Sequence, residues 1–152
     1  TTYAGLTTSV PSWQASGNRD SSVHDLAGGT NQNLITIGAS PYYRTITGRL
    51  AWSTGLVGQS VCKQGRATGY GCTTVNSVYF SPSYIPNSTR FLYMNSGTLC
   101  NNGDSGGPWF QSNNAVGLTS GKIYIGSPSN AGNCIVGSIT YQIPSGWMLT
   151  TT

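Results

Sequence analysis

Eight consecutive residues, Gly103-Asp104-Ser105-Gly106-Gly107-Pro108-Trp109-Phe110, constrain the fold of this chain more than any other segment. The glycines around Ser105 allow tight backbone turns that other residues would strain. Such turns bring backbone N–H groups beside the serine hydroxyl, where they can hold the oxyanion that forms when a serine attacks a carbonyl group. Ser105 is therefore the predicted nucleophile, and the N–H groups of Gly103 and Ser105 are the predicted oxyanion hole. The alternative is an ordinary turn, because Gly, Asp and Ser are common turn residues.

The rest of the chain favours strands over helices. Only 7% of the residues are charged, Glu is absent, and 21 of the 152 residues are Gly. Short strand-like segments alternate with turn residues, which is typical of an all-β barrel or sandwich. Residues 1–20 could add one or two strands, and a short helix is expected only at Ser145–Leu149. The expected strands are Asn33–Ile37, Tyr43–Trp52, Ser60–Lys63, Cys72–Phe80, Phe91–Asn95, Pro108–Phe110, Ala115–Ser120, Lys122–Ile125 and Ser138–Ile143.

Charge and cysteine content narrow the class of protein. The seven basic residues are scattered, which argues against a nucleic-acid partner. No stretch approaches the ~18 apolar residues of a membrane span, and Thr1 opens no apolar leader, so we expect a mature soluble product. The four cysteines include no CxxC pair, and His24 is the one histidine, so we expect two disulfides and a secreted protein with no metal or cofactor. Four cysteines allow three pairings.

Four segments together resemble a known family. Gly103–Phe110 resembles the nucleophile motif of chymotrypsin-like serine proteases, and the others resemble the bacterial streptogrisin and α-lytic branch of that family. Val61–Cys72 is similar to the disulfide hairpin of this branch. Gly117–Gly121 is similar to the strand beside its primary specificity pocket, and Asn130–Cys134 to its second half-cystine. The resemblance covers roughly residues 25–144.

The resemblance implies a fold and an activity. The fold is a pair of antiparallel Greek-key β-barrels, with the C-terminal barrel at residues 43–152 and only the remaining strands of the N-terminal barrel at residues 1–42. The implied disulfides are Cys62–Cys72 and Cys100–Cys134. The implied activity is that of a serine endopeptidase, which hydrolyses protein or peptide substrates through an acyl-enzyme on Ser105.

The family also implies charged partners for the serine loop. An aspartate orients the catalytic base, and Asp25 is the candidate because it lies 80 positions before Ser105 and has the small residue Ala27 two positions after it. Asp20 is the rival, and an ordinary turn or cap residue is the alternative for Asp25. The resemblance gives this aspartate a second partner in the Ser120 hydroxyl. It also implies a buried structural ion pair of Asp104 with Lys63.

Substrate recognition is expected along Thr119, Ser120, Gly121 and Lys122, where a peptide would add as an antiparallel strand. The branch has a second glycine where this chain has Lys122. The lysine could narrow the specificity pocket or attract an acidic side chain. It could also point to solvent, with its stem lying on Tyr124 or Tyr141.

The catalytic histidine of the family has no counterpart in its usual place, well before the aspartate. Adjacent side chains of a strand point to opposite faces, so His24 cannot easily bind Asp25 and also reach Ser105. We therefore expect a separate N-terminal chain of the same precursor to supply the histidine, because a barrel without its first strands exposes unpaired edges. The alternative is a catalytically inactive pseudoprotease that acts as a binding module.

Overall fold

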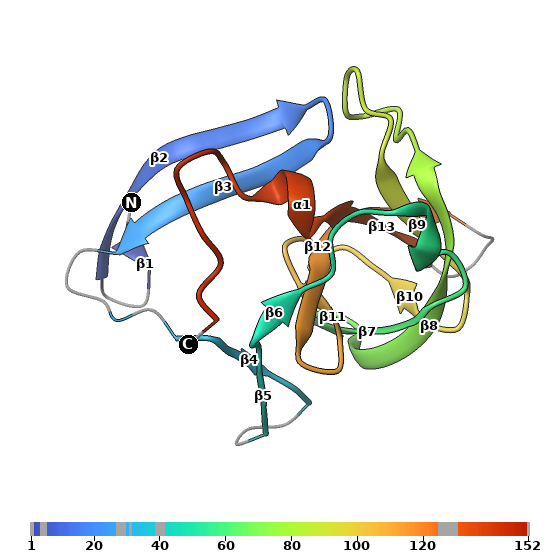
Figure 1. Cartoon of the computed structure of the whole chain (residues 1–152), viewed down its shortest axis with the longest axis horizontal. Coiled ribbons are helices and arrows are strands. Elements are labelled where there is room, and N and C mark those ends of the chain that lie inside the picture. Colours follow the sequence, from blue (N-terminus) through green and yellow to red (C-terminus); the bar gives the residue numbers. More distant parts are fainter. Residues whose placement is uncertain are drawn as a thin grey trace.

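The computed structural model describes residues 2–3, 6–26, 30, 32–38, 42–124 and 131–151, without the side chains of residues 2–3, 6–13, 23–26 and 124. Most of this part of the chain is β-strand (Figure 1). The strands are β1 (Thr2–Tyr3), β2 (Leu6–Ser16), β3 (Arg19–Leu26), β4 (Leu34–Thr36), β5 (Tyr43–Thr45), β6 (Gly48–Arg49), β7 (Ser60–Gly65), β8 (Gly69–Phe80), β9 (Phe91–Met94), β10 (Leu99–Cys100), β11 (Pro108–Gln111), β12 (Asn114–Tyr124) and β13 (Gly132–Ser138). The helical elements are the 3₁₀ turn η1 (Thr54–Leu56) and the short helix α1 (Ile139–Gln142).

Six strands close into one antiparallel barrel, in the order β13-β9-β8-β7-β11-β12, with β12 pairing back onto β13. Closure gives each of these six strands a partner on both sides along part of its length. The interior is filled by side chains without exposed surface, among them Val61, Leu92, Trp109, Val116 and Val136. The predicted all-β fold with a complete C-terminal barrel is confirmed.

Both predicted disulfides are also confirmed. Cys62–Cys72 joins the paired strands β7 and β8, and Cys100–Cys134 joins β10 to β13. The second disulfide ties the start of the loop that carries Ser105 to the wall of the barrel. The nucleophile loop is thereby anchored at its N-terminal end.

The strands before the barrel form an open sheet. β1, β2 and β3 make a three-stranded antiparallel sheet, whose long β2–β3 hairpin lies beside the barrel in Figure 1. β4 and β5 form a separate two-stranded sheet that crosses the expected domain boundary after residue 42. That boundary stays a prediction, whereas the expectation of only a partial N-terminal barrel in this chain is confirmed.

Two predictions of local structure near the C-terminus are wrong. The expected strand Ser138–Ile143 contains the helix α1, because the Ser138 hydroxyl caps it by accepting a hydrogen bond from the Thr140 N–H. The expected helix Ser145–Leu149 is a turn followed by irregular chain, in which Gly146 has a φ of 85°. Earlier in the chain, a single strand, β12, replaces the two expected strands Ala115–Ser120 and Lys122–Ile125. β12 ends at Tyr124, and Ile125 lies outside the described residues.

Gln142, at the end of α1, fixes the β2–β3 hairpin against the barrel. Its buried side-chain amide accepts a hydrogen bond from Asp20 N at 2.8 Å and donates one to Asn18 O at 2.9 Å. Its backbone carbonyl accepts a hydrogen bond from Ser21 Oγ at 2.7 Å. A Cβ at Gly137 would collide with this amide, so the position needs a glycine. These contacts set where Asp20 lies. No described segment forms a helix long and apolar enough to cross a bilayer.

Candidate active site

The nucleophile loop is folded by its own backbone hydrogen bonds. Asp104 N donates to Asn101 O at 3.0 Å, Gly107 N to Asp104 O at 2.9 Å, and Gly106 N to Thr119 O at 2.8 Å. Gly103 and Gly106 have φ angles of 100° and 81°, a region that strains other residues. Within the described residues, the N–H groups of Gly103 and Ser105 have no internal acceptor. With Ser105 itself exposed, these two groups are available to an oxygen of a bound substrate.

Asp104 is completely buried and satisfied by four donors. Its Oδ1 accepts from the N–H groups of Ala67 and Thr68, at 2.8 and 3.0 Å. Its Oδ2 accepts from the Thr68 hydroxyl at 2.6 Å and from Asn101 N at 2.8 Å. A Cβ at Gly65 would collide with the carboxylate, so this glycine makes room for it. The loop that carries Ser105 is thus held from beneath by one charged group.

Lys63 is the cation predicted for Asp104, and the two meet through a bridging hydroxyl. Lys63, which has no exposed surface, donates from Nζ to Thr68 Oγ1 at 2.5 Å and to Gly69 O at 3.1 Å. Thr68 Oγ1 in turn donates to Asp104. Between these two described side chains, no direct nitrogen–oxygen contact lies within 4.0 Å. The carboxylate oxygens already accept from backbone N–H groups, which leaves the flexible lysine to approach through Thr68.

Burial and hydrogen bonding shift both groups. Burial alone would raise the pKa of Asp104, but the bonds from Thr68 Oγ and from the N–H groups of Asn101, Thr68 and Ala67 outweigh it and hold the pKa below its usual value. Burial lowers the pKa of Lys63, and the charge of Asp104 opposes this only in part. Asp104 is therefore a structural carboxylate that stays ionised.

A second aspartate, Asp20, lies across a cavity from Ser105. Its Oδ2 accepts a hydrogen bond of 2.5 Å from Ser120 Oγ. The cavity, of about 490 Å³, has Asp20 and Ser120 in its wall together with Ser105. The other residues of its wall are Gln14, Ser21, Ser22, Gly106, Leu118 and Thr119. A group in this cavity could contact both the carboxylate and the serine hydroxyl.

The structure thus gives Asp20, the rival candidate, the Ser120 contact expected of the catalytic aspartate. Asp25 and His24 lie farther along β3, and their side chains are outside the described part of the structure. Because a strand rises about 3.3 Å per residue, the Cα of Asp25 is about 16 Å from that of Asp20. Ser120 cannot bond to both.

The expected substrate-binding strand has three different roles along its length. Thr119 is buried and accepts a hydrogen bond from Trp109 Nε1 at 2.8 Å, so its side chain belongs to the core. Ser120 is skipped in the β12–β13 register, as in a β-bulge, which frequently re-aims a side chain next to an active site. The backbone of Thr119 is bonded to Gly106 and Gly107 of the nucleophile loop. From residue 120 onward β12 pairs only with β13 among the described strands, so its other edge is open to a peptide there.

Lys122 reaches the nucleophile loop. Its Nζ donates to Asn101 Oδ1 at 2.7 Å, and Asn101 N is in turn bonded to Asp104. The lysine therefore spans from the substrate-binding strand to the loop that carries Ser105. The contact with Asn101 places the charge of Lys122 at the start of the nucleophile loop, and its role in the specificity pocket stays a prediction.

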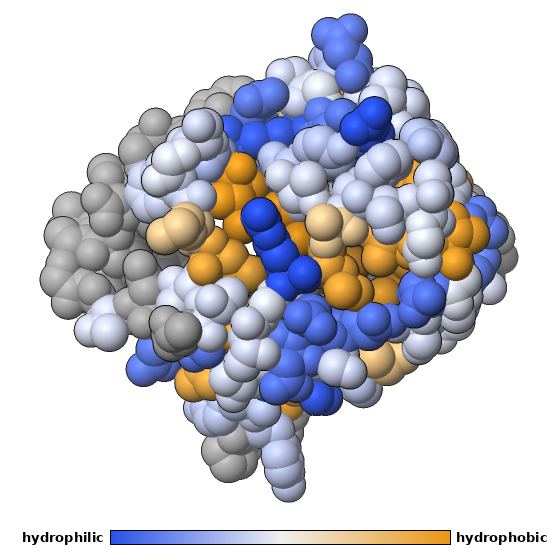
Figure 2. All heavy atoms as spheres, in the orientation of Figure 1, coloured by the Kyte–Doolittle hydropathy of each residue, from blue (hydrophilic) through white to orange (hydrophobic). Residues whose placement is uncertain are grey.

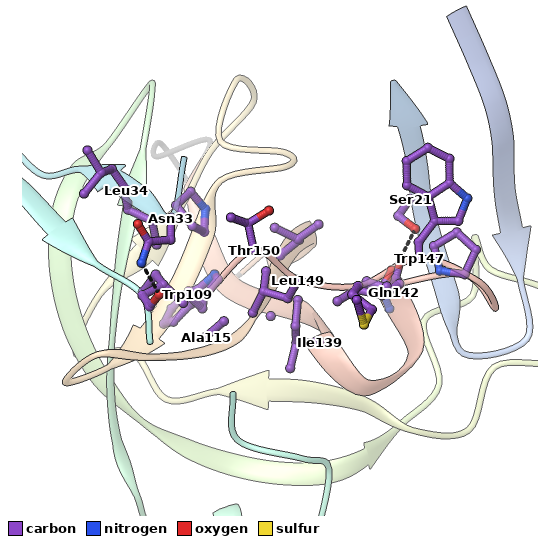
Figure 3. Close-up of a pocket in the computed structure, with 18 of the residues that line it drawn as sticks. Ser21, Asn33, Leu34, Trp109, Ala115, Ile139, Gln142, Trp147, Leu149 and Thr150 are labelled. Atoms are coloured by element: carbon purple, nitrogen blue, oxygen red, sulfur yellow. Dashed lines mark hydrogen bonds between the residues drawn. The ribbon is translucent and has the colours of Figure 1, made fainter. Parts of the chain in front are cut away.

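An apolar groove of about 490 Å³ lies between the hairpin and the barrel (Figure 3), and it shares part of its wall with the cavity of Asp20. Ser21 and Ser22 of β3 line both hollows. Hydrophobic residues are gathered at the centre of the face seen in Figure 2. Nonpolar residues lining the groove include Leu34, Ile46, Ile139, Ile143, Trp147 and Leu149.

Comparisons with known proteins point to one group of enzymes. No family model matches the chain. Streptogrisin-C of Streptomyces griseus is 35% identical over 89 residues, which are 59% of this chain and 18% of that protein. Protease A of Thermobifida fusca is 30% identical with a TM-score of 0.61, over 78% of this chain and 60% of that one. A glutamic-acid-specific serine protease, 20% identical with a TM-score of 0.65 over 89% of this chain and 67% of that one, has the same fold. The chain thus spans less than a fifth of the length of Streptogrisin-C and about two thirds of the length of the two solved structures.

Proposed function

Because the chain belongs to the chymotrypsin-like serine protease family, we propose that it is the larger part of a secreted serine endopeptidase in which Ser105 is the nucleophile and Asp20 orients the catalytic base. The observation that carries this proposal is the cavity with Ser105 and Asp20 in its wall, where Ser120 fixes the carboxylate. Asp20 takes the role that the sequence alone gave to Asp25. The paired disulfides support an oxidising, extracellular location.

The proposed reaction follows from these positions. A histidine between Asp20 and Ser105 accepts the Ser105 Oγ proton as Oγ bonds to the peptide carbonyl carbon. The N–H groups of Gly103 and Ser105 donate to the resulting oxyanion. The histidine then gives its proton to the leaving amine as the C–N bond breaks, and water hydrolyses the acyl-enzyme by the reverse sequence of proton transfers. Asp20 holds the imidazole in the orientation that these transfers need.

The histidine is proposed to come from a separate N-terminal chain of the same precursor. Among the described strands, β1 and β3 each pair only with β2, so this sheet offers strand edges to such a segment, and the apolar groove offers it hydrophobic surface. The chain spans 60% and 67% of two solved neighbours, so a substantial part of each has no counterpart here. The alternative is a pseudoprotease that acts only as a binding module. It would have the same fold, but no histidine would reach Ser105.

Labelling with a fluorophosphonate tests the proposal, because the reagent reacts with a serine only when a base activates it. We expect the purified native protein to be labelled at Ser105, and the Ser105→Ala variant to remain unlabelled. Intact-mass measurement of the denatured, non-reduced protein should reveal a second polypeptide, and its fragmentation should show a histidine. A single labelled species of this chain alone would contradict the two-chain arrangement. An unlabelled protein would favour the binding module.

Replacing Lys122 tests the specificity of the same site. Because the ammonium group lies beside the nucleophile loop, we expect Lys122→Gly to weaken cleavage after acidic residues by about 10-fold relative to large apolar ones, a ratio expected for loss of one charged contact. Cleavage of a peptide library by parent and variant measures this ratio. Arg49→Gly, which removes an exposed cation of β6 that borders neither hollow at Ser105, is the control. An unchanged cleavage profile would show that Lys122 does not line the pocket.

A further inference from the structure

A chain of hydroxyl groups connects the loop between β8 and β9 to Asp20. Tyr84, in this loop, has its hydroxyl 3.1 Å from Ser120 Oγ, and Ser120 Oγ donates to Asp20 Oδ2. A serine hydroxyl has one proton, and here that proton goes to the carboxylate. Tyr84 must therefore be the donor in its bond to Ser120. The three groups form a directional relay that ends on the aspartate.

The protonation of Tyr84 is consistent with this direction. Partial burial raises the pKa of the phenol; the bond to Ser120 lowers it, and the charge of Asp20 raises it again, so that the pKa stays above its usual value. At neutral pH the phenol keeps its proton and can donate.

The backbone is shaped to accept this tyrosine. A Cβ at Gly121 would collide with the Tyr84 hydroxyl, so the glycine after Ser120 makes room for the ring. The loop is also fixed at the tip of the β2–β3 hairpin, beside which it rises in Figure 1. Gly17 N donates to Pro86 O at 2.7 Å, and Asn18 Oδ1 accepts from Thr89 N at 2.9 Å. The hairpin that carries Asp20 and the loop that carries Tyr84 are thus held together at two points.

We propose that Tyr84 is a positioning residue, which orients the Ser120 hydroxyl toward Asp20 and thereby holds the aspartate in place for the catalytic base. The inference rests on the proposed protease function for its effect on rate. Without the phenol, the Ser120 hydroxyl would be free to turn away from the carboxylate, and Asp20 would lose its fixed partner.

A double-mutant cycle on the rate of fluorophosphonate labelling tests the relay. We expect Tyr84→Phe to slow labelling of Ser105 by about 3- to 10-fold, the usual effect of one neutral hydrogen bond. In a Ser120→Ala background the same change should have almost no effect, because the group through which Tyr84 acts is gone. Tyr79→Phe, which removes an exposed hydroxyl that makes no hydrogen bond in the described structure, should label at the parent rate. An equal effect of Tyr84→Phe in both backgrounds, or no effect in either, would overturn the proposal.

A second measurement needs no catalysis. In NMR titrations of the protein labelled with ¹³C-tyrosine, we expect Tyr84 to titrate above the usual phenol pKa of 10.0, and Asp20→Asn to lower the pKa of Tyr84. If Asp20→Asn leaves the pKa of Tyr84 unchanged, the relay does not exist. If the parent protein is never labelled, the protease function fails, and the titration still decides whether Tyr84 is coupled to Asp20.

Discussion

In the proposed two-chain protease, Asp20→Asn is expected to lower kcat/KM by about 10⁴-fold. The carboxylate accepts the Ser120 hydrogen bond and borders the same cavity as Ser105, so it is placed to hold the imidazole in the correct tautomer. The amide keeps the shape of the carboxylate, but its NH₂ group donates where the carboxylate accepts, and it carries no charge. Steady-state hydrolysis of a peptide substrate measures the loss, and circular dichroism checks that the fold is retained.

Asp25→Asn is the matched control, since it makes the same chemical change five positions along the same strand. We expect its kcat/KM to stay within about twofold of the parent, as for most substitutions away from the reacting groups. A large loss in Asp25→Asn, with Asp20→Asn active, would return the orienting role to Asp25 and remove Asp20 from the mechanism.

The contrast between these two aspartates indicates what a sequence can reveal here. Asp25 has a suitable distance from Ser105 and the small residue Ala27 two positions later, but Asp20 is also followed at that spacing by a small residue, Ser22. The contact that separates them joins Asp20 to Ser120, across 100 positions of the chain. No local pattern contains that information.

The barrel was more predictable than the surroundings of the site, because local and tertiary preferences agree there. The strand Phe91–Met94 combines β-forming residues with complete burial of all but Tyr93, and the disulfide pairs follow from the family resemblance. β13 (Gly132–Ser138) was missed, since its glycines and asparagine interrupt the strand pattern. In α1 the residues Ile139–Gln142 favour a strand, and the Ser138 cap and the contacts of Gln142 override that preference.

Asp104→Ala is expected to be the most destabilising single change in the loop, lowering the free energy of unfolding by about 3–5 kcal/mol. It leaves Lys63 charged and buried without its counter-charge, and it leaves the N–H groups of Ala67, Thr68 and Asn101 without their acceptor. The nucleophile loop should lose its shape together with its anchor. Urea unfolding measures the stability, and fluorophosphonate labelling of Ser105 should disappear under native conditions.

The comparison with Lys63→Met separates the contribution of the Asp104 carboxylate from that of the buried Lys63 charge. Lys63→Met should also destabilise the loop but by a smaller amount, because Asp104 keeps all four donors and the buried lysine pays a desolvation cost that methionine does not. Equal losses in the two variants would mean that the charge pair, and not the backbone hydrogen bonds, holds the loop.

Acid should affect the parent in the same way as Asp104→Ala. The folded state lowers the pKa of Asp104, so its contribution to stability is complete above the usual value of 3.8 and is lost as the pH falls through the lower folded pKa. Lys63 acts at the other end of the scale: its folded pKa is lowered, so its burial costs stability while it is charged, and this cost is relieved as the pH rises toward 10.5. Urea midpoints measured from neutral pH down to below 3.8 should therefore fall more steeply for the parent than for Asp104→Ala. Parallel curves would show that Asp104 does not stabilise the fold through its charge, and the nucleophile loop would then need another anchor.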